Sequence, residues 1–292
     1  MPTLRLATRG SAQAVTQAEH VVARLADVGL DATLVIVETH GDRTQATNVP
    51  LHTIGGQGVF VKEVQAAVLD GRADVAVHSA KDLPTETDPG LTIAAWTERR
   101  DAADALIGAT LDGLSEGATV ATGSVRRRAQ LAHARPDLEF AELRGNIHTR
   151  LERIPDGGAI VMAVAALQVL GITDRLGERL DPAVFVPAVG QGCVALESRL
   201  DDADTNAALA AIDHAPTRRA VEIERAFLAE LGSGCSLPVG AHVVGDVVTT
   251  FLASDDGAVV HRETIELSGD HDLDVATARS AARTARDRVD GR

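Results

Sequence analysis

Short apolar runs alternate with amphipathic stretches along the chain, and this alternation predicts strands followed by helices. The N-terminal part contains predicted strands at 4–8, 32–38 and 74–78, with helices at about 11–28 and 59–69. Strand, helix and strand joined by short connections are typical of a parallel sheet covered by helices. The first part of the chain is therefore predicted to be an α/β domain.

The same pattern restarts after Ala102. It gives strands at 105–107, 119–121, 137–141 and 159–163, with helices after Ser124 and Asn146 as N-caps. Downstream lie a predicted strand at 194–197, helices at 204–212 and 217–231, strands at 241–253 and 258–266, and a helix at 270–289. A second α/β unit and a small C-terminal α+β part are expected. The polar segment 39–57 is long for an ordered connection, which predicts a lid.

The charge of the chain disfavours two classes of partner. Lys and Arg number 28 against 42 Asp and Glu, so the net charge is −14, and aromatic residues are 2%. Such a chain is repelled by nucleic acid and anionic membranes, and it offers little stacking surface for bases. The acidic, Lys-poor composition fits either concentrated salt or an Arg- and Ala-rich high-GC genome, and both origins stay open. The chain has neither a transmembrane-length apolar run nor a secretory signal, so a cytoplasmic protein is expected.

An arginine-rich stretch stands out against this acidity. Residues 121–153 hold seven Arg and four acidic residues. A solvated helix face would explain several of them, DNA binding is the weakest explanation, and an anion pocket is the sharper one, since guanidinium matches carboxylate or phosphate. No phosphate-binding GxxxxGK[ST] loop is present, so carboxylates are the better candidate for the anion.

Polar residues also follow the predicted strands where ligands of open α/β sheets bind. These strand-end residues are Arg9, Ser11, Ser79, Lys81, Asp82, Thr122, Ser124, Arg126, Arg127, Arg144, Asn146 and Arg150. Lys81 and Asp82 could form a surface ion pair, but their place after a buried strand favours a role in a cleft, where a carboxylate could hold a cationic intermediate. His78 could be a base or a satisfied strand-end histidine.

The two cysteines form neither a CxxC pair nor a zinc pattern. Composition alone predicts two small buried hydrophobes, and Cys193 is kept as structural. Both lie in glycine-rich surroundings, at 190–193 and 232–238, which predicts open backbone near the sulfur, and a core cysteine does not need this.

Nine short segments, taken in order, resemble the porphobilinogen deaminase (hydroxymethylbilane synthase) family. They are 7–11 (ATRGS), 41–42 (GD), 55–63 (GGQGVFVKE), 77–84 (VHSAKDLP), 122–127 (TGSVRR), 143–146 (LRGN), 149–151 (TRL), 187–192 (PAVGQG) and 234–240 (GCSLPVG). Each is weak alone, but their number, order and spacing cover nearly the whole chain.

The resemblance implies an α/β protein with two domains akin to periplasmic binding proteins and a small α+β domain. The implied ranges are 1–97 with 192–213 for domain 1, 101–187 for domain 2, and 216–292 for domain 3. It implies a monomeric transferase of tetrapyrrole (haem) biosynthesis with no metal. The enzyme condenses four porphobilinogen molecules head to tail on a dipyrromethane cofactor, held by a thioether to Cys235, and releases hydroxymethylbilane and ammonia.

The resemblance also assigns roles. Asp82 would be the catalytic carboxylate, stabilising the azafulvene-like cation left when ammonia departs. The residues that would hold the cofactor are Cys235, Ser79, Lys81, Thr122, Ser124, Arg126, Arg127 and Arg144. Those that would line the substrate site are Arg9, Ser11, Phe60, Arg150 and Gln191. Thr53, Gln57 and Val169 replace basic residues that are usual in the family.

A non-catalytic receptor for a small carboxylate, built on the same kind of fold, is the alternative. Cys235 in its glycine-rich loop separates the two hypotheses, because a receptor does not require that thiol.

Overall fold

The computed structural model describes residues 3–39, 61–232 and 237–291. Within them the chain forms two compact units, residues 1–100 with 192–218 and residues 101–191 with 219–292. The predicted lid, Phe60 and Cys235, as well as Thr53 and Gln57, lie outside the described residues. The division into three domains stays a prediction.

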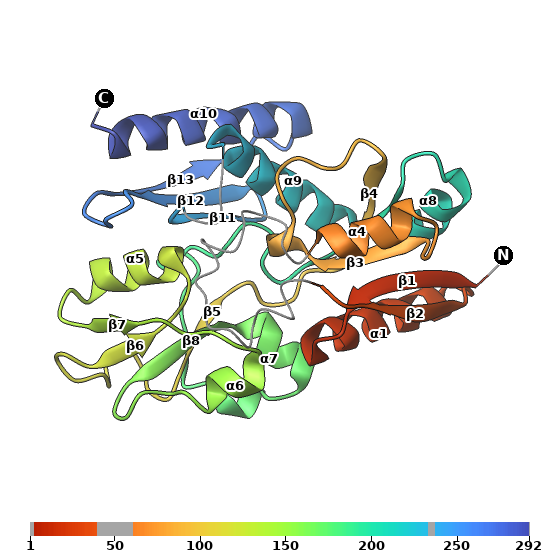
Figure 1. The fold of residues 1–292 in the computed structure, drawn as a ribbon. Helices are drawn as coiled ribbons and strands as arrows, with labels where there is room; N and C mark the ends of the chain where they lie inside the picture. The colour runs from red at the N-terminus through yellow and green to blue at the C-terminus, as the bar shows by residue number, and fades with distance from the viewer. Residues whose placement is uncertain (1–2, 40–60, 233–236, 292) are drawn as a thin grey trace. The chain divides into compact units, whose positions relative to one another are not determined.

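The first unit is a five-stranded sheet with the order β2-β1-β3-β10-β4 (Figure 1). Its strands are β1 (Leu4–Arg9), β2 (Ala32–Val37), β3 (Val75–Ser79), β4 (Leu91–Trp96) and β10 (Val194–Arg199). The strands β1, β2 and β3 are parallel, whereas β10 runs antiparallel to both β3 and β4. The parallel sheet predicted for the first 80 residues is confirmed in β1, β2 and β3. The strand β10, which returns from the second unit, adds an antiparallel part to it.

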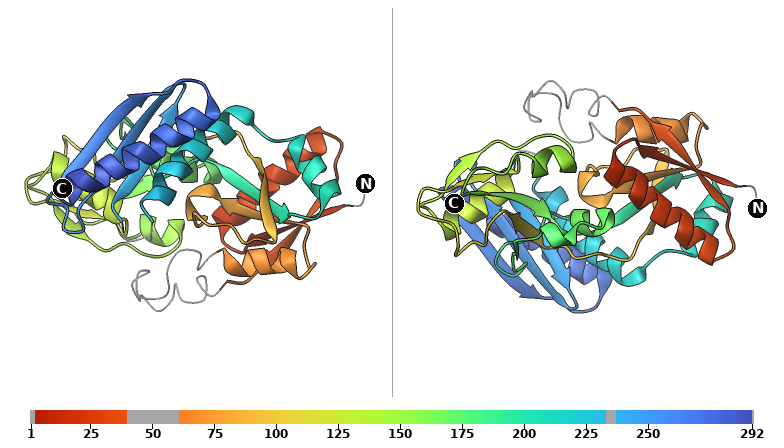
Figure 2. Two further views of the ribbon diagram at one scale, coloured as in Figure 1. Left: turned by 90° about the horizontal axis from the view of Figure 1, so that it is seen from above. Right: turned by 90° about the horizontal axis from the view of Figure 1, so that it is seen from below.

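Helices cover both faces of this sheet. They are α1 (Ala12–Asp27), α4 (Lys62–Leu69) and α8 (Ala203–Ala210), and the short helix η2 (Ala80–Asp82) follows β3. Successive residues of a strand point to opposite faces. Thus Leu6 packs in the core that α1 and α8 cover, and Ala7 packs in the core that α4 covers. Figure 2 shows α1 lying along one face of the sheet.

The second unit contains a sheet of the same plan, with the order β7-β6-β8-β5-β9. Its strands are β5 (Asp104–Ile107), β6 (Thr119–Ala121), β7 (Glu139–Ala141), β8 (Ala159–Ala163) and β9 (Glu178–Arg179). Its helices are α5 (Val125–Ala134), α6 (Ile147–Leu151), α7 (Val164–Leu170) and the short η3 (Thr173–Arg175). Here β5 is the antiparallel strand, paired with β8 on one side and β9 on the other. Asp104 is the first residue of this strand, which lies between β8 and the edge strand β9.

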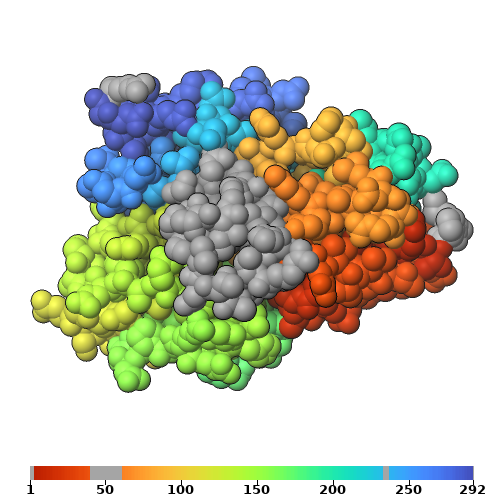
Figure 3. All heavy atoms as spheres, in the orientation of Figure 1, coloured from red at the N-terminus to blue at the C-terminus, as the bar shows by residue number. Residues whose placement is uncertain are grey.

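The C-terminal part of this unit is a three-stranded antiparallel sheet with two helices. The elements are α9 (Ala215–Glu230), β11 (Val239–Val244), β12 (Val247–Ala253), β13 (Val260–Glu266) and α10 (His271–Val289). The single strand predicted at 241–253 is a hairpin, because Gly245 adopts a φ of +57° that makes the turn between β11 and β12. The outer side of α10 lies at the surface in Figure 3.

The predicted fold class, α/β with a small C-terminal α+β part, is confirmed. Three elements were not predicted: β4, β9 and α7. The strand β9 has two residues and α7 has seven, so neither shows a full period of its pattern in the sequence.

Candidate functional site

Two arginines of the arginine-rich stretch begin helix α5. The Oγ of Ser124, the predicted N-cap, accepts a hydrogen bond from the backbone N–H of Arg127 at 3.4 Å, and Thr122 Oγ1 accepts one from Ser124 N at 3.2 Å. A Cβ at Gly123 would lie 2.9 Å from the carbonyl oxygen of Leu143, so this turn needs glycine. The turn directs the side chains of Arg126 and Arg127 inward, where they are 4% and 9% exposed.

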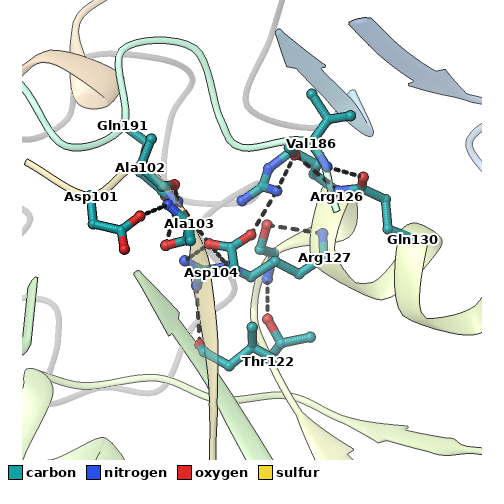
Figure 4. A network of polar contacts seen from close by, with 12 residues as sticks. Asp101, Ala102, Ala103, Asp104, Thr122, Arg126, Arg127, Gln130, Val186 and Gln191 are labelled. Carbon is teal, nitrogen blue, oxygen red and sulfur yellow. Dashed lines mark hydrogen bonds and ion pairs between the residues drawn. The ribbon is translucent and has the colours of Figure 1, made fainter. Parts of the chain in front are cut away.

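Both guanidinium groups bind one carboxylate, that of Asp104 (Figure 4). Arg127 donates from Nε at 3.0 Å and from Nη2 at 2.7 Å to Oδ1, and Arg126 Nη1 lies 2.8 Å from Oδ2. Arg127 Nη1 also donates to the carbonyl of Val161 at 3.0 Å, and Arg126 Nη1 donates to that of Val186 at 2.6 Å. Asp104 itself is 1% exposed. We call Asp104, Arg126 and Arg127 the arginine–aspartate cluster.

The cluster carries one more positive charge than negative charge. Burial by itself raises the pKa of Asp104, but the charges and hydrogen bonds of Arg126 and Arg127 outweigh it and hold the pKa well below its usual range. Asp104 is therefore ionised and balances only one of the two arginines. Across the described ranges, Asp104 is the one carboxylate recorded in contact with either guanidinium. A buried charge without a partner is costly, so the cluster favours an anion as its missing partner.

Gln191 and Gln130 complete the network. The side-chain amide of Gln191 donates to Asp104 Oδ1 at 2.8 Å and to the carbonyl of Ala102 at 2.7 Å. Gln130 accepts from Val186 N at 2.6 Å and donates to the Val186 carbonyl at 3.1 Å. Gln191 is 1% exposed, so its recorded contacts are structural, and its expected role in substrate binding stays a prediction.

Two further arginines belong to the region of helix α6 in the same unit: Arg144 precedes the helix and Arg150 lies within it. Asn146 caps this helix as predicted, with Oδ1 accepting from Thr149 N at 3.0 Å. Gly145 has a φ of +109°, and a Cβ there would lie 2.9 Å from Thr149, so glycine is needed between Arg144 and the cap. Arg150 Nε donates to the Gly145 carbonyl at 2.8 Å. Arg144 is half-buried, and within the described residues no partner of its guanidinium is recorded, so it is available to an anion.

The first unit holds the other predicted residues at the ends of β1 and β3. Asp82 is exposed at the end of η2, and Lys81 beside it is half-buried. Ser79 Oγ donates to Gln17 Oε1 of α1 at 2.9 Å. Arg9, at the end of β1, is half-buried, and Ser11 caps α1 by accepting from Ala14 N at 3.3 Å. The prediction that Ser11 caps this helix is confirmed.

His78 is buried against an acid rather than presented to solvent. Its Nε2 lies 3.0 Å from Glu197 Oε2, and this oxygen also accepts a hydrogen bond from Gln65 Nε2 at 2.9 Å. His78 and Glu197 are 5% and 1% exposed. The three side chains come from β3, β10 and α4, so they tie the strand that precedes Asp82 to the face of the sheet beneath α4.

Replacing His78 with alanine should lower the free energy of unfolding by about 1–3 kcal/mol, because the buried Glu197 would keep the hydrogen bond from Gln65 but lose the ring that lies 3.0 Å from its carboxylate. Arg24→Ala removes an exposed pair with Asp27 and should change it by less than about 0.5 kcal/mol. Urea unfolding at neutral pH measures both. Equal, small effects of the two substitutions would contradict a structural role for the His78–Glu197 contact.

Acid should destabilise the protein through Asp104. The pKa of Asp104 is depressed in the folded state, so its contribution to stability is complete above the ordinary value of about 3.9 and is lost as pH falls toward the folded-state value. The free energy of unfolding should therefore fall below about pH 4. In Asp104→Asn the decline from the variant's own value at pH 7 should be shallower, and an equally steep decline would contradict this assignment.

Sequence reasoning missed the polar partners in these contacts, which are Asp104, Gln130, Glu197, Gln65 and Gln17. An acid at the start of the apolar run 104–107, and another inside 194–197, were the available signals. Charged residues are rarely buried without a partner, so an acid within a predicted core strand predicts a buried cation nearby. No comparable signal exists for Gln17 on the amphipathic helix α1.

Other expectations concern cysteine, metal and membrane. Cys193 is buried, as expected for a structural residue. In the part of the chain that the structure describes, no group of three or more His, Cys, Asp or Glu side chains is placed to hold a metal ion. Among the same residues, no helix has both the length and the apolarity that crossing a membrane requires.

Comparisons with known proteins agree over most of the chain. Residues 4–207 match the family described as "Porphobilinogen deaminase, dipyromethane cofactor binding domain", and residues 218–285 match "Porphobilinogen deaminase, C-terminal domain". The chain is 45% identical over 282 residues to the porphobilinogen deaminase of Nitratidesulfovibrio vulgaris strain DP4, covering 92% of this chain and 89% of the relative. It is 46% identical over 275 residues to that of Xanthomonas campestris pv. campestris strain B100, covering 90% of each.

Similarity to solved structures is much lower. The methionine-binding protein MetQ is 15% identical, with a TM-score of 0.43, over 74% of this chain and 92% of that chain. A similarity of this size supports no inference about the site.

Proposed function

Because the chain belongs to the porphobilinogen deaminase family, we propose that it is a hydroxymethylbilane synthase with Asp82 as its catalytic carboxylate. It is a transferase, and its reaction condenses four porphobilinogen molecules with loss of ammonia in tetrapyrrole biosynthesis. The non-catalytic receptor is not favoured, since both matched families are parts of this enzyme.

The surplus positive charge of the arginine–aspartate cluster is the observation that carries the proposal. A cluster that served folding alone would need one arginine for one aspartate. Two buried arginines on one ionised carboxylate leave a cation to be matched by a ligand's anion. Porphobilinogen brings two carboxylates in each molecule, which is the anion that guanidinium groups bind best in pairs of parallel hydrogen bonds.

The residues fit the cofactor that the family implies. When bound, the dipyrromethane group supplies the primer that receives the substrate units. We propose that Cys235 holds it through a thioether and that its acidic side chains are held by strand-end residues. These residues are Ser79, Lys81, Thr122, Ser124, Arg126, Arg127 and Arg144.

The two cluster arginines differ in what they can offer a carboxylate. Arg127 uses all three guanidinium nitrogens in recorded contacts with Asp104 and Val161. Arg126 uses Nη1, and no contact of its Nε or Nη2 is recorded within the described residues. Nε and Nη2 form one edge of the group, which suits two parallel hydrogen bonds to one carboxylate. Arg126 is therefore the arginine that receives the carboxylate, and Arg127 donates through its remaining N–H groups.

Asp82 acts from the first unit. Its exposed carboxylate, at the end of η2, hydrogen-bonds pyrrole N–H groups and stabilises the positive charge that develops as ammonia leaves. Five residues line the site of the incoming substrate. These are Arg9, Ser11, Phe60, Arg150 and Gln191. The protein works as a monomer in the cytoplasm without nucleic acid or a membrane as a partner.

Product analysis tests the proposed function. Purified protein incubated with porphobilinogen should release four molecules of ammonia for each molecule of hydroxymethylbilane. A receptor would bind porphobilinogen and release no ammonia, and that result would overturn the proposal. Unfolding in low and molar salt, measured on the same preparation, tests whether the acidic composition is an adaptation to salt.

A further inference from the structure

We propose that Asp104 is the positioning residue of the site: its single carboxylate sets the orientation of both cluster arginines and so determines whether the cofactor can be assembled. The inference rests on the proposed function, because it concerns the arginines that hold the cofactor's carboxylates.

All the hydrogen-bonding capacity of Asp104 is directed at the protein. Oδ1 accepts two hydrogen bonds from Arg127 and one from Gln191, and Oδ2 faces Arg126 Nη1. At 1% exposure, the carboxylate has no surface left for a ligand. Asp104 therefore acts on a ligand only through the arginines that it holds.

The backbone of Asp104 is held in place by the sheet. Asp104 is the first residue of β5, it pairs with Ala163 of β8, and its carbonyl accepts a hydrogen bond from Leu180 N at 2.9 Å. The arginines, in contrast, reach it through long side chains from the start of α5. A strand paired on both sides fixes the position of a side chain more firmly than a flexible arginine can fix itself.

Gln191, the residue after which the chain leaves the second unit for the first, also binds Asp104. The crossing toward the second unit precedes residue 101, and the return follows residue 191. The Gln191 amide binds both the Ala102 carbonyl and Asp104 Oδ1, so the two ends of the segment 101–191 are joined at the carboxylate that holds the arginines (Figure 4). These two contacts explain why a glutamine is buried at this position.

The charges of the cluster give a further reason why loss of Asp104 should misplace the two arginines. Loss of one arginine leaves a neutral pair, whereas loss of the carboxylate leaves two buried cations side by side. Removing Asp104 should thus turn the guanidinium groups away from each other and from the geometry that a carboxylate ligand needs. Misplacement of a binding group by about 1 Å reduces function by on the order of 10²-fold.

The experiment compares Asp104→Asn, Asp104→Glu and a control, Asp137→Asn. The control removes an acid that binds both Nε and Nη2 of Arg135, at 2.8 and 2.6 Å, away from the cluster. Each protein is produced without cofactor, its folded fraction is isolated by size exclusion, and it is titrated with porphobilinogen. The fraction carrying two added pyrrole units is read by intact mass.

Asp104→Asn should need at least about tenfold more porphobilinogen for half loading. Asp104→Glu, which keeps the charge but moves it by one methylene, should lie between Asp104→Asn and wild type, and Asp137→Asn should match wild type. If Asp104→Asn yields no folded protein, Asp104→Glu decides: loading equal to wild type overturns the proposal. Equal loading of folded Asp104→Asn and wild type also overturns it. A wild-type protein that never gains mass overturns the proposed function instead.

Discussion

Replacing Asp82 with asparagine should lower kcat by about 10³-fold or more while the protein stays folded. The side chain is exposed, and no ion pair of its carboxylate is recorded within the described residues, so the fold does not depend on its charge. An amide keeps the size of the group but cannot stabilise a developing cation. The rate of ammonia release, on preparations with matched cofactor content, measures the effect.

Asp31→Asn provides the matched control for this variant. Asp31 is also an exposed aspartate of the first unit, and its substitution removes the same charge from the chain. It should leave kcat within about twofold of wild type, since its charge is screened from a distant site. An Asp82→Asn protein that retains a tenth or more of the wild-type kcat would contradict the assignment of Asp82.

Replacing Arg126 with leucine should abolish cofactor loading without weakening the fold. The remaining Arg127–Asp104 pair is neutral, so the free energy of unfolding of the cofactor-free protein should stay within about 1 kcal/mol of wild type or rise. Loading should fall because the Nε–Nη2 edge of Arg126 is gone. Urea unfolding and intact mass on the same sample separate the two effects.

Arg135→Leu should show the opposite pattern. Arg135 donates to the carbonyls of Leu111 and Leu114 and binds Asp137, so its loss removes structural contacts of the second unit. The variant should unfold more easily and still load its cofactor. If Arg126→Leu instead resembled Arg135→Leu, with lower stability and normal loading, the surplus charge would have no role in binding.

The local parts of the site could be predicted from the sequence. Ser11, Ser124 and Asn146 were identified as N-caps because a cap and its helix lie within a few residues of each other. The sequence also predicted the polar residues that follow β1, β3 and β6, because a strand end and the residues after it are adjacent in the chain. These predictions required neither a partner from elsewhere in the chain nor knowledge of strand order.

The partners of these residues could not be predicted, because they are fixed by sheet topology. Asp104 meets Arg126 and Arg127 only because β5 enters the sheet antiparallel, between β8 and β9. Glu197 meets His78 for the same reason in the first unit, through β10. Hydrophobic patterns predict that a strand exists, but they do not give its neighbours or direction. The surplus charge of the cluster therefore became visible only in the structure.

Intact mass before and after addition of porphobilinogen, with wild type and Cys235→Ser side by side, tests the central claim most directly. Wild-type protein should carry two pyrrole units above its sequence mass and gain further units when substrate is added. Cys235→Ser should keep the bare sequence mass under both conditions. Active wild-type protein at its bare sequence mass, or a Cys235→Ser protein that carries the adduct, would contradict a covalent primer on Cys235.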